Sequence, residues 1–234
     1  MTDAIKLISG TSHPVLAAEI AQHLGLPLCE TEIHRFGNEN ILFQCKENVR
    51  ESDVFVIQTS CPPVSDLIME LLIIIDALKH ASARRITAVI PYFGYSTMER
   101  SVKPGEAVTA KINARRLSQI PNSDRGNVFL MLDLHVSGIL HYFEGDCLRY
   151  ELSSEKVLAE ALTELKLKDF IFGTADLGKT KWTETFANKF SVDLVFIRKS
   201  RDYKKTKVLG VIGEVKGKTI IIYEYEPSKI IISS

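Results

Sequence analysis

Short apolar segments alternate with amphipathic ones along most of the chain, and this alternation restricts the possible folds more than any other feature. Apolar runs bounded by turn formers predict strands over 4–10, 53–58, 85–93 and 127–135. Helical periodicity predicts helices over 13–26, 64–81 and 108–120. Pro14 starts the first of these helices and Gly25 ends it. This order predicts an α/β fold with mainly parallel sheets covered by helices on both faces.

The alternation restarts after Tyr150. Helices are expected over 155–165 and 180–190. Strands are expected over 169–176 and 193–199, followed by a hairpin-like pair over 207–225. We therefore expect two α/β domains, 1–149 and 150–234. The second has few predicted strands, so its sheet is expected to be incomplete.

The composition indicates an ordinary globular protein, with 234 residues of which 45% are hydrophobic. Lysine plus arginine and aspartate plus glutamate both total 29, so the net charge gives no indication of binding to nucleic acid or to an anionic membrane. The longest apolar run is interrupted by Glu70 and Asp76, and the N-terminus lacks the pattern of a signal peptide. No membrane span is expected.

The four cysteines are widely spaced and form no C-x-x-C pair. They are Cys29, Cys45, Cys61 and Cys147. This spacing argues against a zinc site or a redox motif and favours reduced core thiols. A cytoplasmic location is the corresponding expectation.

Polar residues follow several of the predicted strands, where open parallel sheets bind their ligands. Asp133 and His135 are two residues apart, so they share one side of the strand if it continues through them. In that arrangement they could ligate a divalent ion directly or through water. A buried hydrogen bond between the two side chains is the alternative.

The segment after 85–93 carries Tyr92, Phe93 and Tyr95, and then a long loop with Glu99 and Arg100. The aromatic rings could sandwich a base or could pack in the core. A loop of this length is commonly functional when it is ordered.

Two further segments suggest an anion site. Asp176 and Gly178 lie between a predicted strand and a helix, where backbone N–H groups favour an anion. The basic run 198–207 is the strongest loop signal in the chain and is read either as a solvated hairpin loop or as a functional one. Together these pieces suggest a metal-assisted site for a phosphorylated ligand.

The stretch "DVFVIQTSCPPVSDLIMELLIIIDALKHASARRITAVIPYFGY", followed by "MLDLH", strongly resembles ribose-phosphate pyrophosphokinase, the PRPP synthetase family. The resemblance is close over most of 6–145 and looser over 150–222. It implies two phosphoribosyltransferase-like domains that transfer the diphosphoryl group of Mg-ATP to ribose 5-phosphate. The products would be PRPP and AMP, for nucleotide biosynthesis. It also implies homo-oligomers built from dimers, with an ATP pocket completed across subunits.

The resemblance also assigns roles to individual residues of this chain. It implies that Lys199 and Arg201 are catalytic and stabilise the charge that develops during transfer. It implies a magnesium site made by Asp133, His135, Glu144 and Asp176. It implies ATP contacts from Phe36, Asn38, Asn40, Arg100 and His135.

The chain departs from the family pattern in several places, among them Leu67 in place of an asparagine and Lys179 in place of a glycine. Asn40 replaces a glutamate, and Thr97 and Met98 stand where an arginine and a glutamine are usual. Near the C-terminus, Glu224 aligns with the acidic pair that meets the ribose hydroxyls, but the loop that wraps the 5-phosphate has no counterpart. A non-catalytic PRPP synthetase-associated subunit that binds nucleotide is therefore the alternative to the enzyme.

Overall fold

The computed structural model describes residues 4–175, 180–202, 205–224 and 229–233. The chain divides into two compact units, Met1–Ser153 and Ser154–Ser234. The sequence suggested a boundary between 149 and 150. Strand pairing continues past that point, because the strand Leu148–Leu152 still belongs to the first sheet.

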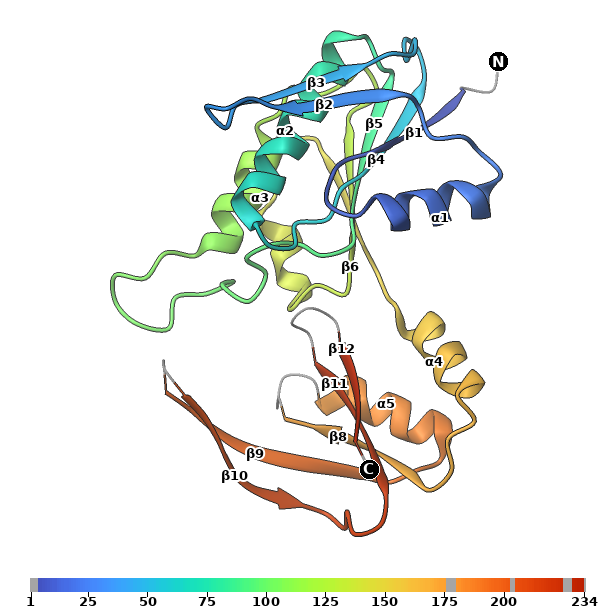
Figure 1. Cartoon of the computed structure of the whole chain (residues 1–234). Coiled ribbons are helices and arrows are strands. Elements are labelled where there is room, and N and C mark those ends of the chain that lie inside the picture. The colour runs from blue at the N-terminus through green and yellow to red at the C-terminus, as the bar shows by residue number, and fades with distance from the viewer. Residues whose placement is uncertain (1–3, 176–179, 203–204, 225–228, 234) are drawn as a thin grey trace. The chain divides into compact units, whose positions relative to one another are not determined.

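The first unit is built on a five-stranded sheet in the order β1-β4-β5-β6-β7, and every neighbouring pair in it is parallel (Figure 1). Its strands are β1 (Ile5–Ser9), β4 (Asp53–Ile57), β5 (Arg85–Ile90), β6 (Asn127–Leu132) and β7 (Leu148–Leu152). The central strands are buried on both faces, which explains their continuous apolar runs. The predicted α/β class is confirmed.

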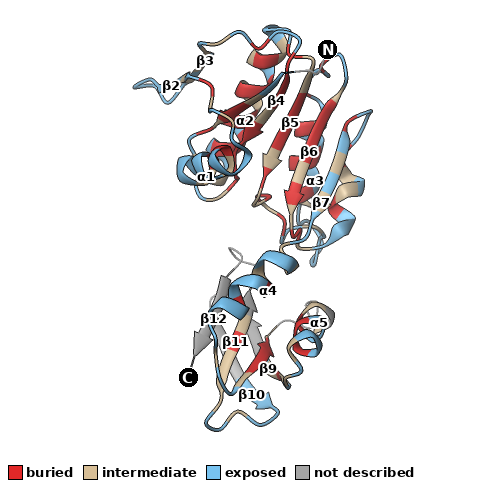
Figure 2. Cartoon of the chain, turned by 90° about the vertical axis from the view of Figure 1, so that its right-hand side faces the viewer, coloured by how far each residue is buried: buried red, intermediate tan, exposed pale blue. Residues whose placement is uncertain are grey.

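Helices cover both faces of this sheet. They are α1 (Pro14–Leu24), α2 (Val64–His80), α3 (Thr109–Ser118) and the 3₁₀ helix η1 (Ser137–Tyr142). Figures 1 and 2 show α1 on one face and α2 and α3 on the other. Gly25 ends α1 in the left-handed conformation, with φ of 64°. The covering helices therefore change face between β1 and β4.

A two-stranded hairpin, β2 (Thr31–Arg35) and β3 (Ile41–Cys45), lies against α2. The sequence suggested only an irregular polar stretch here. Each strand has only five residues, none of them fully buried, so it lacks the long apolar run by which the other strands were recognised.

The second unit holds a mixed sheet in the order β10-β9-β8-β11-β12. Its strands are β8 (Phe170–Thr174), β9 (Leu194–Asp202), β10 (Lys205–Ile212), β11 (Thr219–Glu224) and β12 (Lys229–Ser233). Its helices are α4 (Glu155–Glu164) and α5 (Thr180–Phe190). Phe172 and Phe186 are fully buried at the centre of its core.

Two predictions for this unit are wrong. The basic run 198–207 is mostly strand in its described part, because β9 continues through Asp202 and β10 begins at Lys205, while 203 and 204 lie outside the described residues. The predicted pair over 207–225 does not form either. Instead, β10 pairs with β9, while β11 joins β8 in parallel and β12 in antiparallel fashion. The hydrogen bonds of a strand pair join backbone N–H and C=O groups. A segment with many charged side chains can therefore form strands where its composition suggests a loop.

The expectation of core thiols fits two of the four cysteines, because Cys45 and Cys61 are only half-buried. All four are free thiols, with Cys29 and Cys147 buried. No helix in the described part of the chain is both long and apolar enough to cross a membrane.

Candidate active site

The carboxyl ends of β5 and β6 carry the polar residues that the sequence suggested. Asp133 follows β6 directly and is only 9% exposed. Its φ of 43° is left-handed, so the strand ends at Leu132 instead of continuing to His135. The expectation that Asp133 and His135 share one side of a strand therefore does not apply. The segment is held by its neighbour strand, since Leu134 N donates to Glu151 Oε1 at 2.9 Å.

A serine from the preceding loop holds His135. The backbone N–H of His135 donates to Ser96 Oγ at 3.1 Å, and Ser96 is fully buried. Sequence reasoning missed Ser96 as a contributor to this site. The two residues are 39 positions apart, and only the adjacency of β5 and β6 brings them together.

The long loop after β5 is anchored by hydrogen bonds at Met98 and Glu99. Tyr142 OH donates to the carbonyl of Glu99 at 2.6 Å, and Ala110 N donates to the carbonyl of Met98 at 3.2 Å. The side chain of Glu99 is 13% exposed, whereas the next residue, Arg100, is 78% exposed and pairs with Glu99 at 3.5 Å. Arg100 therefore extends into solvent from a fixed backbone.

The aromatic residues after β5 do not form one stacking platform. Phe93 is fully buried and packs against Phe143 with 6.0 Å between ring centroids. Tyr95 OH shares a 2.8 Å hydrogen bond with Ser65 Oγ. For Phe93, core packing is therefore the correct reading of the two that the sequence left open.

The hairpin residues proposed for ATP lie in and beside the turn between β2 and β3. Phe36 is 45% exposed and contacts His34 edge to face at 4.7 Å. Asn38 Oδ1 accepts a hydrogen bond from Asn40 N at 3.2 Å. The turn presents an aromatic ring and two amides at the tip of the hairpin.

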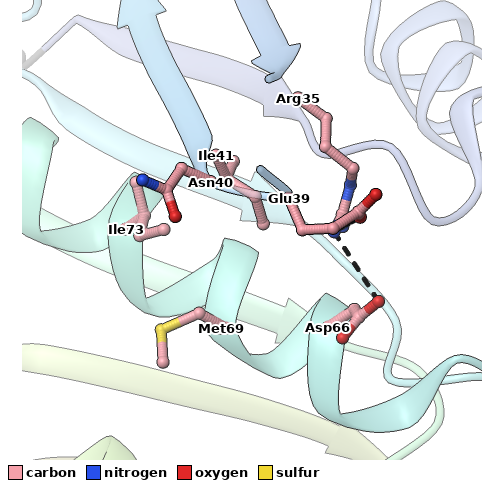
Figure 3. A pocket seen from close by; sticks show the side chains of 7 residues that line it. All are labelled: Arg35, Glu39, Asn40, Ile41, Asp66, Met69 and Ile73. Carbon is pink, nitrogen blue, oxygen red and sulfur yellow. Dashed lines mark hydrogen bonds and ion pairs between the residues drawn. The ribbon is translucent and has the colours of Figure 1, made fainter. Parts of the chain in front are cut away.

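A groove of about 550 Å³ lies between this hairpin and α2, and Figure 3 shows its lining. The lining residues are Arg35, Glu39, Asn40, Ile41, Asp66, Met69 and Ile73. Arg35 Nη1 lies 3.0 Å from Glu39 Oε2 and 3.7 Å from Asp66 Oδ2. The second of these ion pairs ties the hairpin to α2, next to an apolar floor of Met69 and Ile73.

Glu144 and Asp176 are the two remaining predicted metal ligands. Glu144 forms an ion pair with Arg115 at 2.6 Å and is about half exposed. Asp176 lies outside the described residues. Within the described ranges, no three His, Cys, Asp or Glu side chains are grouped so that they could hold a metal ion.

The residues proposed for catalysis and for ribose binding lie on strands of the second unit. In the backbone register, Lys199 pairs with Val208 and Arg201 with Thr206, across β9 and β10. Glu224 ends β11 and pairs with Lys229 of β12.

A separate group of titratable residues lies around β1 and β3. The hydrogen bond from Lys6 Nζ to Glu47 Oε2, 2.6 Å long, raises the pKa of Lys6 and lowers the pKa of Glu47. Burial, with a smaller contribution from the Glu47 carboxylate, raises the pKa of the Cys29 thiol to about 11. Cys29 is therefore protonated at neutral pH, which suits a core thiol and not a nucleophile.

Known proteins resemble this chain over both units. Residues 5–120 match the family model described as the N-terminal domain of ribose phosphate pyrophosphokinase. A ribose-phosphate pyrophosphokinase of Prochlorococcus marinus is 40% identical over 222 residues, which is 94% of this chain and 65% of the relative. One from Chlorobaculum tepidum is 38% identical over 226 residues, which is 96% of this chain and 68% of the relative. The chain thus spans about two thirds of their length.

A solved structure is similar as well. The crystal structure of phosphoribosylpyrophosphate synthetase from Mycobacterium smegmatis superposes with a TM-score of 0.80 at 30% sequence identity. The match covers 95% of this chain and 71% of that one, so it includes the folds of both units.

Proposed function

The chain belongs to the ribose-phosphate pyrophosphokinase family, and from that premise we propose that it transfers the diphosphoryl group of Mg-ATP to the 1-hydroxyl of ribose 5-phosphate. The products are PRPP and AMP. The observation that carries the proposal is the length of the similarity, which extends over 96% of the chain and therefore over both units. A non-catalytic subunit is not favoured, because the curated relatives carry the name of the enzyme.

ATP is proposed to bind at the carboxyl ends of β5 and β6. His135 would contact the phosphates, and its backbone hydrogen bond to Ser96 would keep it in position. Arg100 would add a solvent-facing cation from the anchored loop. Phe36, Asn38 and Asn40 would contact the base from the tip of a hairpin, where an exposed ring and amides suit stacking and hydrogen bonding.

Magnesium is proposed to arrive as Mg-ATP. Such ions are commonly held by one or two carboxylates together with substrate phosphates, so a site with few protein ligands fits. Asp133, a mostly buried carboxylate beside His135, is the main candidate, with Glu144 and Asp176 as further acidic groups. When bound, the ion neutralises charge on the phosphates.

Lys199 and Arg201 are proposed to stabilise the charge that develops at the β-phosphoryl group. Glu224 is proposed to accept hydrogen bonds from the ribose hydroxyls at the end of β11. A homo-oligomer built from dimers, in the cytoplasm, completes the proposal.

A coupled assay of AMP release from Mg-ATP, with and without ribose 5-phosphate, tests the function. AMP formation that requires the sugar supports the proposal. ATP binding without sugar-dependent AMP release would refute it.

The catalytic assignment is tested by Lys199→Ala beside Lys216→Ala, which removes an exposed lysine from the turn between β10 and β11. Lys199→Ala should abolish turnover and leave the dissociation constant of ATP unchanged, whereas Lys216→Ala should leave both unchanged. Equal loss of ATP binding and turnover in Lys199→Ala would contradict a role in the transfer step.

A further inference from the structure

The helices covering the first sheet change face at the carboxyl ends of β1 and β4, called the crevice below, because α1 leads from β1 to a parallel bridge between Leu28 and Leu7 whereas α2 follows β4 (Figures 1 and 2). In open parallel sheets such a switch point is the usual ligand site, and a loop that leads into a helix N-terminus commonly binds the anionic part of the ligand. Here the loop 10–13 leads from β1 into α1. The proposed ATP residues do not use this crevice.

A carboxylate of the chain itself occupies the crevice. Glu70 of α2 is only 3% exposed. Its Oε1 accepts the backbone N–H of Thr11 at 2.7 Å, and its Oε2 accepts the Thr11 hydroxyl at 2.7 Å. Gln58 Nε2 donates a third hydrogen bond to Oε1 at 2.9 Å. The carboxylate is thus held from two sides by donors of the β1–α1 loop and of the residue after β4.

Gln58 completes the closure. It is fully buried, and its Oε1 accepts the backbone N–H of Ser12 at 3.1 Å. A Cβ at Gly10 would lie 2.1 Å from this oxygen, so only glycine permits the approach. Ser12 Oγ in turn accepts the backbone N–H of Thr59 at 2.8 Å. These hydrogen bonds join the loop 10–13 directly to the residues that follow β4.

The donors that hold the Glu70 carboxylate are all neutral. Across the ranges that the structure describes, Glu70 takes part in no ion pair. Three hydrogen bonds and the nearby positive end of α1, an eleven-residue helix, stabilise the anion instead. A bound formate or acetate ion would need this same set of donors.

We propose that the β1–α1 loop is an anion cradle whose resident anion is the Glu70 carboxylate, and that shortening this side chain opens a site for a small free carboxylate. The switch point of the first unit is therefore closed to substrates by the chain itself. Phosphorylated ligands must bind elsewhere, which is where the proposed function places them. The inference does not depend on that function.

Chemical rescue of Glu70→Ala in the full chain tests the proposal. Thermal unfolding is followed in sodium formate, acetate, phosphate or chloride at equal ionic strength. Glu70→Ala should unfold at a lower temperature than the wild type and regain stability in formate and acetate along a saturating curve. At ten times its dissociation constant, the ion multiplies the folded-to-unfolded ratio about elevenfold. Chloride should have no such effect, and rescue by phosphate would extend the cradle to larger anions.

Glu70→Gln is the matched control, because it keeps the volume of the side chain but places an amide against the donors of Thr11. It should be destabilised and should not respond to formate. If Glu70→Ala does not fold, its soluble yield on refolding should depend on formate. No saturating response of stability or yield in Glu70→Ala, or the same response in all three proteins, overturns the proposal.

Discussion

Replacing Ser96 with alanine removes the acceptor that holds the His135 segment. Ser96 Oγ receives the backbone N–H of His135 at 3.1 Å, and the serine is fully buried. Alanine fits the same space, so Ser96→Ala introduces no clash. It leaves an N–H group at the edge of the proposed ATP site without its acceptor.

The expected loss of folding free energy follows from the burial of Ser96 and His135. A buried donor left without a partner costs about 1–3 kcal/mol. His135 is itself half-buried, so water can partly replace the lost acceptor, and about 1–2 kcal/mol is expected. For a chain of this size that corresponds to a Tm decrease of roughly 2–8 °C. If the imidazole moves out of position, 1.4 kcal/mol corresponds to about a tenfold weaker ATP affinity.

Thermal unfolding and the dissociation constant of Mg-ATP should be measured on Ser96→Ala and on Ser123→Ala. Ser123 is a similarly buried serine whose Oγ donates to the carbonyl of Gly126 at 2.6 Å, in the turn before β6. Both variants should lose stability, and only Ser96→Ala should lose ATP affinity. Equal Tm losses with unchanged ATP affinity in both proteins would refute a positioning role for Ser96.

Three further outcomes are expected. Asp66→Ala removes the 3.7 Å ion pair that ties the hairpin to α2. Limited chymotrypsin cleavage at Phe36 should therefore accelerate up to about fivefold. Glu39→Ala is the control, because it leaves this ion pair intact. Because the pKa of Cys29 is raised to about 11, its iodoacetamide alkylation at pH 8, followed by mass spectrometry, should be about a hundredfold slower than that of an ordinary thiol, and denaturant should abolish the difference. Phe172→Ala should destabilise the second unit by about 3–5 kcal/mol, with lost hydrogen-exchange protection there and none lost in the first unit.

Local pattern was sufficient for the elements with long apolar faces. The helix predicted over 64–81 is α2, Val64–His80, and the helix predicted over 13–26 is α1, which ends at Gly25 as expected. The family assigned from the residues is also confirmed by the comparisons. In these cases periodicity and capping residues are encoded within a single turn or strand.

Local pattern failed where distant strands decide the conformation. In the basic run, 198–202 and 205–207 are strand because β9 and β10 pair through their backbones. The strand expected to reach His135 ends at Leu132, because Asp133 adopts a left-handed φ and its N–H pairs with the carbonyl of Leu152. The charge and the spacing of residues along the sequence indicate neither of these pairings.

By itself, then, the sequence determined the α/β class, the main helices, the family and the residue types of the candidate site. Only the tertiary structure decided which groups hold those residues, as Ser96 holds His135 and Tyr142 holds Glu99, and only it placed Glu70 in the crevice beside β1. Periodicity is a property of neighbouring residues. These hydrogen bonds join positions 39, 43 and 59 residues apart, and they form only because packing brings the carboxyl ends of the strands together.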